Sequence, residues 1–358
     1  MEDRDVADLA RLIPPLLDAL EALGLIARYL NPPDLPALLA AVGEPDAALA
    51  AARAGLVWSA DLGIAGQALD AAADHAEGAF AALREAGEDT GRVYRALRGL
   101  PRAQEALYPL AAGFAPISRF FLEPARRGDD ALVARLADAP VREDTGVMHI
   151  GRAPGERGGA SLYVPEDYCD DREWPLVVAL HGGAGSGRWF LWSWLRDARS
   201  HGAILAAPTA VGDTWALSGP DADTPNLARV VEAVRTRWRI DRARILMTGM
   251  SDGGTFSYVS GLEPASPFTH LAPIAAAFHP MLAAMADRER LSALPIHIIH
   301  GVLDWMFPVE MAREAQAALT ASGAAVTYRE LDDLPHTYPR ELNPEILAWL
   351  DRTASERT

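Results

Sequence analysis

Alanine and leucine recur at helical spacing through the first 145 residues. Such spacing predicts amphipathic helices, and its clearest stripe is Leu9, Leu12, Ile13, Leu16, Leu17, Leu20 and Leu23. Proline and glycine divide the region into five or six helices, at Pro32-Pro33, Gly43, Gly87 and Gly99-Leu100-Pro101. Because β-branched residues are scarce and no fixed-period repeat occurs, residues 1–145 are expected to form a helical domain and not a solenoid.

The pattern changes near residue 145, where short apolar runs begin to alternate with helical stretches. The predicted strands are 147–150, 161–164, 176–180, 203–207, 245–248, 271–276, 296–299 and 326–330. The predicted helices are 192–199, 226–238, 253–261, 281–288, 309–322 and 344–352. This alternation indicates a mostly parallel sheet with helices on both faces. The fold class is therefore α/β over residues 146–358, preceded by an all-α domain over 1–145.

Composition narrows the classes of function. Half of the 358 residues are hydrophobic and 23% are charged, enough apolar material for a sizeable core. The net charge of −16 makes nucleic acid or an anionic membrane surface an unfavourable partner. The chain contains no lysine, which excludes Schiff-base and lysine-base mechanisms.

Targeting and redox signals are sparse. Cys169 is the only cysteine, so neither an intramolecular disulfide nor a cysteine-based zinc cluster is expected. The first residues are acidic where a signal peptide needs positive charge, and no run of about 18 apolar residues occurs. We therefore expect a cytoplasmic protein without a membrane span.

A candidate nucleophile lies between a strand and a helix. The run Gly249-Met250-Ser251-Asp252-Gly253 follows the apolar segment 245–248 and precedes a helical stretch. In a nucleophile elbow the serine adopts a strained conformation, and glycines two positions before and after it avoid clashes. Because the same five-residue pattern also arises by chance as a tight turn with a capping serine, its placement at a strand end is what favours Ser251 as a nucleophile.

Serine needs a histidine base, and the histidine needs an orienting carboxylate. In an α/β-hydrolase the chain order is nucleophile, acid, histidine. Asp304 follows the strand at 296–299 and His336 follows the strand at 326–330, which predicts the set Ser251, Asp304 and His336. Asp332 and Asp333 lie too close to His336 in sequence for the usual geometry.

Other histidines offer alternatives. His297 and His300 suggest a metal site with Asp304, but residues three apart on a strand point to opposite faces, so no metal is predicted. His279 is interpreted as a packed or rim residue.

A glycine-rich loop supplies the remaining chemistry. The strand at 176–180 runs into His181-Gly182-Gly183-Ala184-Gly185-Ser186-Gly187. Such a loop lets backbone N–H groups approach a substrate, and acyl transfer needs two N–H donors on the oxyanion. We predict the amides of Gly183 and Asp252, with Ala184 as the alternative to Gly183. A phosphate loop is excluded because its lysine is missing.

Tryptophans follow several predicted strand ends. Trp189, Trp215 and Trp305 are the candidates for lining an apolar substrate pocket, and ordinary core packing is the alternative for each.

Together these segments resemble the phospholipase/carboxylesterase branch of the α/β-hydrolases, near the polyhydroxybutyrate-depolymerase-like and feruloyl-esterase-like enzymes, over about residues 146–354. The resemblance is carried by Val177–Gly183, Thr248–Gly254, His300–Asp304 with Pro308, and His336. It implies hydrolysis of carboxylic ester or thioester bonds of a small-molecule substrate through an acyl-serine, with no cofactor. A peptidase, an acyl-thioesterase and a catalytically inert partner-binding protein are the alternatives.

Two departures from that branch matter. Asp252 stands where many relatives carry Gln or Ala, so a negative charge borders the expected pocket and would discourage anionic acyl groups. The helical region 1–145 is an extension that the branch normally lacks. Its apolar stripes suit either a cap over the site or a homo-oligomer interface.

Overall fold

The computed structural model describes residues 3–87 and 89–356. The chain divides into two compact units, Met1–Asp138 and Ala139–Thr358. The sequence pattern placed this boundary between residues 145 and 146, where the first strand begins.

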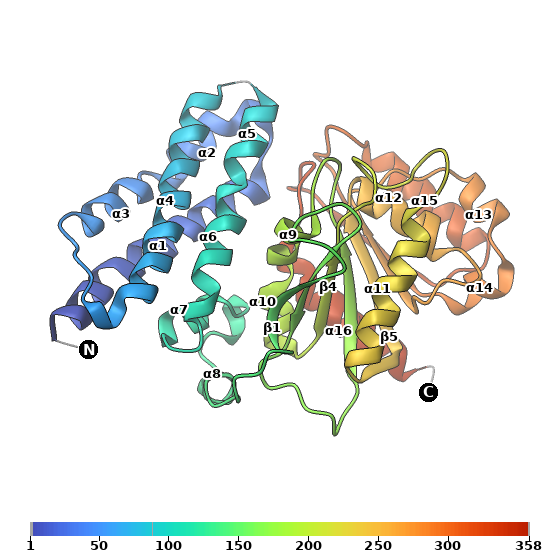
Figure 1. Ribbon diagram of the computed structural model, residues 1–358. Coiled ribbons are helices and arrows are strands. Elements are labelled where there is room, and N and C mark those ends of the chain that lie inside the picture. Colours follow the sequence, from blue (N-terminus) through green and yellow to red (C-terminus); the bar gives the residue numbers. More distant parts are fainter. Residues whose placement is uncertain (1–2, 88, 357–358) are drawn as a thin grey trace. The chain divides into compact units, whose positions relative to one another are not determined.

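Helices make up the first unit (Figure 1). Its described residues contain eight α-helices rather than the five or six predicted: α1 (Asp3–Tyr29), α2 (Leu35–Val42), α3 (Pro45–Arg53), α4 (Gly63–Ala86), α5 (Thr90–Leu97), α6 (Gly99–Leu107), α7 (Ala115–Phe120) and α8 (Asp130–Ala137), with 3-10 turns at Pro32–Asp34, Ala60–Leu62, Tyr108–Leu110 and Pro124–Arg126. The extra helices arise because the chain also breaks at 3-10 turns that the predicted breaks did not include, such as Ala60–Leu62 and Pro124–Arg126.

The predicted apolar stripe of α1 forms part of this unit's core. All of its members are buried except Leu17, which is half-buried. The helix continues through Pro14 and Pro15 without a break. At the crossing of α4 and α6, a Cβ on Gly99 would lie 2.6 Å from the carbonyl oxygen of His75, so this close approach requires glycine.

One sheet organises the second unit. Its described residues form eight strands, in the order β1-β2-β4-β3-β5-β6-β7-β8. The strand β2 pairs antiparallel with β1 and β4, and the other pairs are parallel. The strands are β1 (Gly146–Ile150), β2 (Ala160–Val164), β3 (Trp174–Leu180), β4 (Ile204–Pro208), β5 (Ile240–Met250), β6 (His270–Ile274), β7 (Ile296–Gly301) and β8 (Val326–Leu331). This is the mostly parallel sheet that the sequence predicted.

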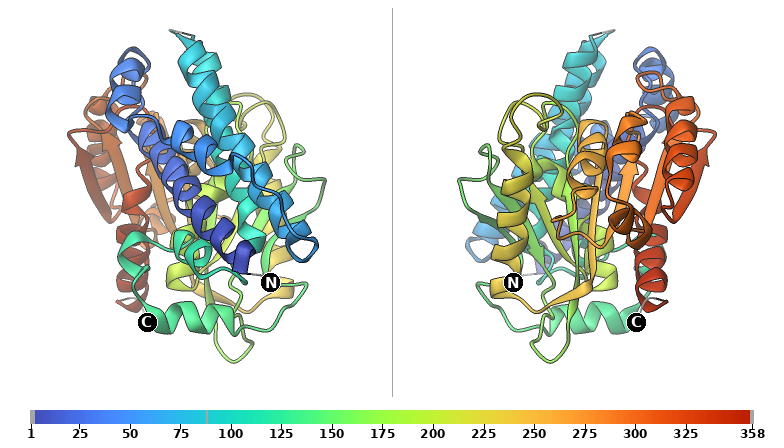
Figure 2. Two further views of the ribbon diagram at one scale, coloured as in Figure 1. Left: turned by 90° about the vertical axis from the view of Figure 1, so that its left-hand side faces the viewer. Right: turned by 90° about the vertical axis from the view of Figure 1, so that its right-hand side faces the viewer.

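Helices cover both faces of this sheet (Figures 1 and 2). The connection from β3 to β4 runs in the opposite direction along the sheet from the one between β4 and β5. Because such crossovers are right-handed, α10 and α11 must lie on opposite faces. The helix α16 packs with α10, and α12 and α15 share the face of α11. The helices are α9 (Gly187–Phe190), α10 (Leu195–His201), α11 (Asp223–Arg237), α12 (Asp252–Gly261), α13 (Met281–Met285), α14 (Arg288–Ala293), α15 (Val309–Ala321) and α16 (Asn343–Ser355).

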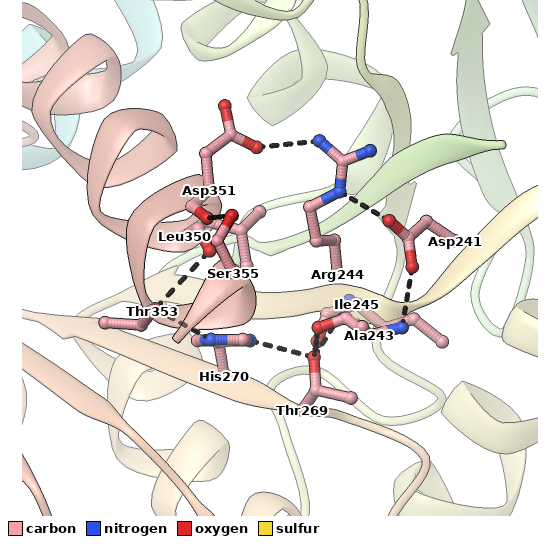
Figure 3. Close-up of polar contacts among 10 residues, drawn as sticks. All are labelled: Asp241, Ala243, Arg244, Ile245, Thr269, His270, Leu350, Asp351, Thr353 and Ser355. Carbon is pink, nitrogen blue, oxygen red and sulfur yellow. Dashed lines mark hydrogen bonds and ion pairs between the residues drawn. The ribbon is translucent and has the colours of Figure 1, made fainter. Parts of the chain in front are cut away.

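Polar groups fix α16 to the amino ends of β5 and β6 (Figure 3). Arg244 donates from Nε to Asp241, at 2.6 Å, and from Nη1 to Asp351 on α16, at 2.8 Å. The His270 ring nitrogens lie 2.8 Å from Thr269 Oγ1 and 2.9 Å from Thr353 Oγ1. The amino edge of the sheet is therefore a structural anchor, which leaves the carboxyl edge for chemistry.

Two hollows of about 560 and 890 Å³ lie within the helical unit, and neither is lined by a residue of the predicted site. No single helix in the described part of the chain has the length and apolarity to cross a membrane, although the bent pair Pro32–Val42 and Pro45–Arg53 together meets those two criteria.

Candidate active site

Ser251 occupies a strained turn between β5 and α12. Its φ of 57° and ψ of −122° lie where L residues are rarely found, and its N–H donates to Ile274 O at 3.0 Å. A Cβ on Gly253 would lie 2.5 Å from the carbonyl oxygens of Leu180 and His181. A Cβ on Gly249 would lie 2.6 Å from the carbonyl carbon of Gly253. Both elbow glycines are therefore required by the backbone packing around the serine.

The structure brings the three predicted side chains into one hydrogen-bonded chain. Ser251 Oγ lies 3.0 Å from His336 Nε2, and His336 Nδ1 lies 2.8 Å from Asp304 Oδ2 and 3.0 Å from Oδ1. All three residues are buried. Because a carboxylate only accepts, Nδ1 carries the proton and Nε2 is free to accept one from the serine.

Asp304 is held by its own turn as well as by the base. Its Oδ1 accepts the N–H groups of Met306 at 2.9 Å and Phe307 at 2.8 Å. His300, at the end of β7, donates from Nε2 to Phe307 O at 2.8 Å and lies 3.4 Å from Asp304 Oδ2. Burial lowers the pKa of His300, which keeps its ring neutral. His300 therefore braces the acid, a role that the sequence pattern did not predict.

The loop that carries His336 is fixed at both ends. A Cβ on Gly301 would lie 2.0 Å from Leu334 O, so β7 and this loop touch through backbone. After the base, Tyr338 OH donates to Asn343 Oδ1 at 2.8 Å, and Asn343 Nδ2 donates to Asp197 Oδ2 at 2.8 Å. These contacts hold the imidazole in place. The alternative acids Asp332 and Asp333 are exposed.

The glycine-rich loop lies beside the elbow. A Cβ on Gly182 would lie 3.6 Å from Ser251 Cβ, and Gly183 and Ala184 are exposed. Ala184 has a φ of 53°, so the loop is strained at a residue next to the predicted oxyanion donor. Gly182 thus lies beside the serine and Gly183 beside the Asp252 side chain, and the amides of Gly183 and Asp252 remain the predicted oxyanion donors.

His181 braces this loop from below. Its Nδ1–H donates to Gly182 O at 2.6 Å, and its Nε2 accepts from Ala210 N at 3.1 Å. Burial lowers the pKa of His181 to about 4, which agrees with this neutral form. Its carbonyl oxygen accepts the indole N–H of Trp215 at 2.7 Å.

The three candidate tryptophans differ in burial and in the groups that surround them. Trp215 is 2% exposed and its ring stacks against Phe256 at 5.5 Å, so it supports the loop instead of lining a pocket. Trp305 is 44% exposed, with its ring centroid 6.0 Å from that of His336. Trp189 is half-buried beneath the guanidinium of Arg188. Trp305 is therefore the one beside the reacting groups.

Other titratable residues lie outside the chain of Ser251, His336 and Asp304. His279 is exposed, and its Nδ1 accepts the N–H of Met281 at 3.2 Å. His297 is buried against Trp349. The described residues contain no group of three or more His, Cys, Asp and Glu side chains arranged to hold a metal ion. Thr214, whose hydroxyl contacts Asp252, was not predicted, because it lies in a loop without periodicity.

The match to a family model covers the elbow, Asp304 and His336. A family model described as Phospholipase/Carboxylesterase matches residues 221–352. A probable feruloyl esterase C of Aspergillus terreus is 31% identical over 114 residues, covering 30% of this chain and 42% of the relative. An oxidized polyvinyl alcohol hydrolase of Sphingopyxis is 30% identical over 99 residues, covering 28% of this chain and 25% of the relative. The matches thus span less than half the length of these curated relatives.

Two solved structures are similar to a little over half of this chain. A thermostable esterase is 24% identical with a TM-score of 0.47, covering 54% of this chain and 58% of its own. A ferulic acid esterase is 15% identical with a TM-score of 0.47, covering 58% of this chain and 99% of its own. The assignment rests on the sequence matches, with the strand order of the sheet in agreement. The second unit has the α/β-hydrolase fold, and its residues 221–352 match the phospholipase/carboxylesterase family.

Proposed function

We propose that this chain is a serine esterase that hydrolyses carboxylic ester or thioester bonds through an acyl-serine intermediate. The observation that carries the proposal is the hydrogen-bonded chain from Ser251 Oγ through His336 to Asp304, behind a serine held at positive φ. Nucleophile, base and orienting acid are all in contact, which is the arrangement that nucleophilic catalysis requires.

The reaction follows from the proton positions. His336 Nε2 takes the proton of Ser251 Oγ, and Oγ forms a bond to the acyl carbon while the carbonyl electron pair moves onto oxygen. The N–H groups of Gly183 and Asp252 hold that oxyanion, and Asp304 stabilises the imidazolium. The imidazolium gives its proton to the leaving alcohol or thiol as the carbon–heteroatom bond breaks. Water, deprotonated by His336, then releases the acid and restores Ser251.

Apolar side chains next to Asp304 indicate the substrate class. Leu303, Trp305 and Met306 are 56%, 44% and 45% exposed, a high fraction for such residues in a segment that adjoins the catalytic acid. The Phe307 ring lies edge-on to His336, with centroids 5.3 Å apart. We therefore propose small, largely apolar acyl or aryl groups as substrates.

The test is labelling by a fluorophosphonate probe together with hydrolysis of 4-nitrophenyl esters of increasing chain length, an aryl ester and a thioester. Ser251→Ala should abolish labelling and lower kcat by roughly 10⁴- to 10⁶-fold, as loss of a nucleophile does elsewhere. Ser257→Ala is the matched control, because that serine lies in α12, the helix that follows Ser251, and its hydroxyl donates to Gly254 O. Turnover retained by Ser251→Ala, or failure of the folded wild-type chain to label, would overturn the proposal.

A further inference from the structure

A carboxylate lies against the oxyanion loop. Asp252 follows the nucleophile directly, and a Cβ built on Gly183 would lie 2.9 Å from Asp252 Oδ2 and 3.5 Å from its Cγ. The Asp252 carboxylate therefore occupies the space that a side chain at position 183 would fill. Since Gly183 is also one of the proposed oxyanion donors, the charge lies next to the place where the acyl carbonyl must sit.

The position of this carboxylate is fixed by a neutral group. Thr214, in the loop after β4, donates its hydroxyl to Asp252 Oδ2 at 2.5 Å. The same loop is held by Asp223, which accepts the N–H groups of Val211 at 2.7 Å and Ala216 at 2.9 Å. The Asp252 side chain is thus held by a braced loop, and its direction is set before any substrate arrives.

No cation neutralises Asp252 among the residues that the structure describes. The nearby Arg157 donates from Nη1 to Gly185 O at 3.2 Å, farther along the oxyanion loop. A hydroxyl shares a hydrogen bond with a carboxylate but leaves its net charge in place. The charge of Asp252 therefore has no direct ion-pair partner among the described residues, and the dipole at the amino end of α12 offsets part of its field.

A charge without an ion-pair partner at this position discriminates between substrates. An acyl group that carries a carboxylate would meet Asp252 as a like charge, whereas one that carries an ammonium would be attracted. Neutral groups would feel the field least. We infer that Asp252, oriented by Thr214, is the specificity-determining residue of the acyl site: it admits neutral and cationic acyl groups and rejects anionic ones. This inference rests on the proposed function.

Rigid, isosteric esters separate charge from shape. The first pair is 4-nitrophenyl benzoates with a para carboxylate or a para carboxamide. The second pair has para trimethylammonium or para tert-butyl. The readout is the ratio of kcat/KM within each pair, so that a general change in activity and the reactivity of each ester cancel between variants.

Asp252→Asn removes the charge and keeps an oxygen that accepts the Thr214 hydroxyl. It should raise the carboxylate to carboxamide ratio, and lower the trimethylammonium to tert-butyl ratio, each by on the order of tenfold, the size expected for a partly solvated charge a few ångströms away. High salt should shrink both shifts. Asp252→Ser, a second neutral variant, should shift both ratios in the same directions.

Thr214→Val is the matched control, because it removes the hydrogen bond and retains the charge. Its ratios should change by less than about threefold, since the Coulomb interaction remains. Equal shifts in Thr214→Val and Asp252→Asn would assign the effect to packing and overturn the inference. Unchanged ratios in Asp252→Asn, with neutral esters still hydrolysed, would overturn it and leave the proposed function standing. A wild-type chain that hydrolyses no neutral ester and does not label would remove the proposed function first.

Discussion

Two imidazole–hydroxyl pairs lie at opposite edges of the same sheet with almost the same spacing. At the carboxyl edge His336 Nε2 is 3.0 Å from Ser251 Oγ, and at the amino edge His270 Nε2 is 2.9 Å from Thr353 Oγ1. The second nitrogen of His336 faces a carboxylate, whereas that of His270 faces the hydroxyl of Thr269. Distance alone does not separate a catalytic pair from a structural one.

The direction of proton donation separates them. Thr353 lies inside α16 and donates its hydroxyl to Trp349 O at 2.7 Å, so it can only accept from His270 Nε2–H. At the carboxyl edge the Asp304 carboxylate requires the proton on His336 Nδ1, and Nε2 faces the serine as a base. The strained turn also frees Ser251 from the helical carbonyl that occupies Thr353. In the proposed mechanism, the carboxylate of Asp304 and the positive φ of Ser251 are what make this serine, unlike Thr353, a nucleophile.

Of the changes predicted here, removing the Asp304 carboxylate should have the largest effect. Asp304→Asn replaces one acceptor oxygen with a donor, which places His336 in the wrong tautomer, so kcat should fall about 10⁴-fold with the fold intact. Hydrolysis of a 4-nitrophenyl ester measures the loss. The control is Asp332→Asn, an exposed carboxylate on the loop that carries the base. Activity of Asp304→Asn within tenfold of wild type would assign the acid elsewhere.

A third imidazole, His297, shows the cost of burying a ring without a hydrogen bond. Its Nε2 lies 3.8 Å from a carboxylate oxygen of Glu345. His297 packs on the same Trp349 as His270, but neither of its ring nitrogens has a hydrogen-bond partner among the described residues. Burial lowers its pKa from 6.5 to about 4. Below pH 6.5 the His297 ring takes up a proton in the unfolded chain but stays neutral in the folded chain. The free energy of unfolding therefore decreases as the pH is lowered, by roughly 3 kcal/mol at pH 4.

His297→Phe should remove that dependence. The free energy of unfolding should rise by about 1 kcal/mol at pH 7, where an unpaired polar ring is replaced by an apolar one. Its slope between pH 6.5 and 4 should flatten, with His181 and His300, whose pKa values burial also lowers, supplying part of what remains. Urea unfolding at a series of pH values measures both effects. Parallel curves for variant and wild type would contradict the account.

Bracing of the acid should matter less than the acid itself. His300→Leu removes the donor to Phe307 O and loosens the turn that presents Asp304, so kcat should fall about 30-fold with little change in KM. His300→Gln, which retains an N–H donor, should recover most of that loss. The pH profile of kcat distinguishes positioning from simple unfolding. Equal losses in both variants would show that ring packing, and not the donor, is what matters.

The strands and the three central site residues could be read from the sequence because burial and chemistry leave marks in it. Apolar runs mark the buried part of each strand, and the chain order of nucleophile, acid and base follows strand ends. The limits of that signal are visible at β5, predicted as 245–248 and observed as Ile240–Met250. Its polar first half lies at a register shift opposite Trp174 to Leu176, where no apolar pattern is required.

Contacts between loops left no such mark. Thr214 reaches Asp252 from a segment with no periodicity, and Trp215 next to it lies beneath the oxyanion loop, where the predicted pocket role does not apply. The bracing role of His300 was not predicted, because its partner is the backbone carbonyl of Phe307, which has no sequence signature.

The smallest effect is expected for a change at the amino edge of the sheet, where His270 contacts Thr353. Thr353→Val keeps the shape of the side chain and leaves His270 Nε2–H without its acceptor inside the anchor of α16 (Figure 3). The free energy of unfolding should fall by about 1 kcal/mol, as for loss of a buried hydrogen-bond partner. Ester hydrolysis should be unchanged, because Thr353 lies at the edge of the sheet away from Ser251. Urea unfolding and kcat/KM measure the two. A fall in the kcat/KM of the folded variant would show that the two edges are coupled. The division between anchor and active site would then be wrong.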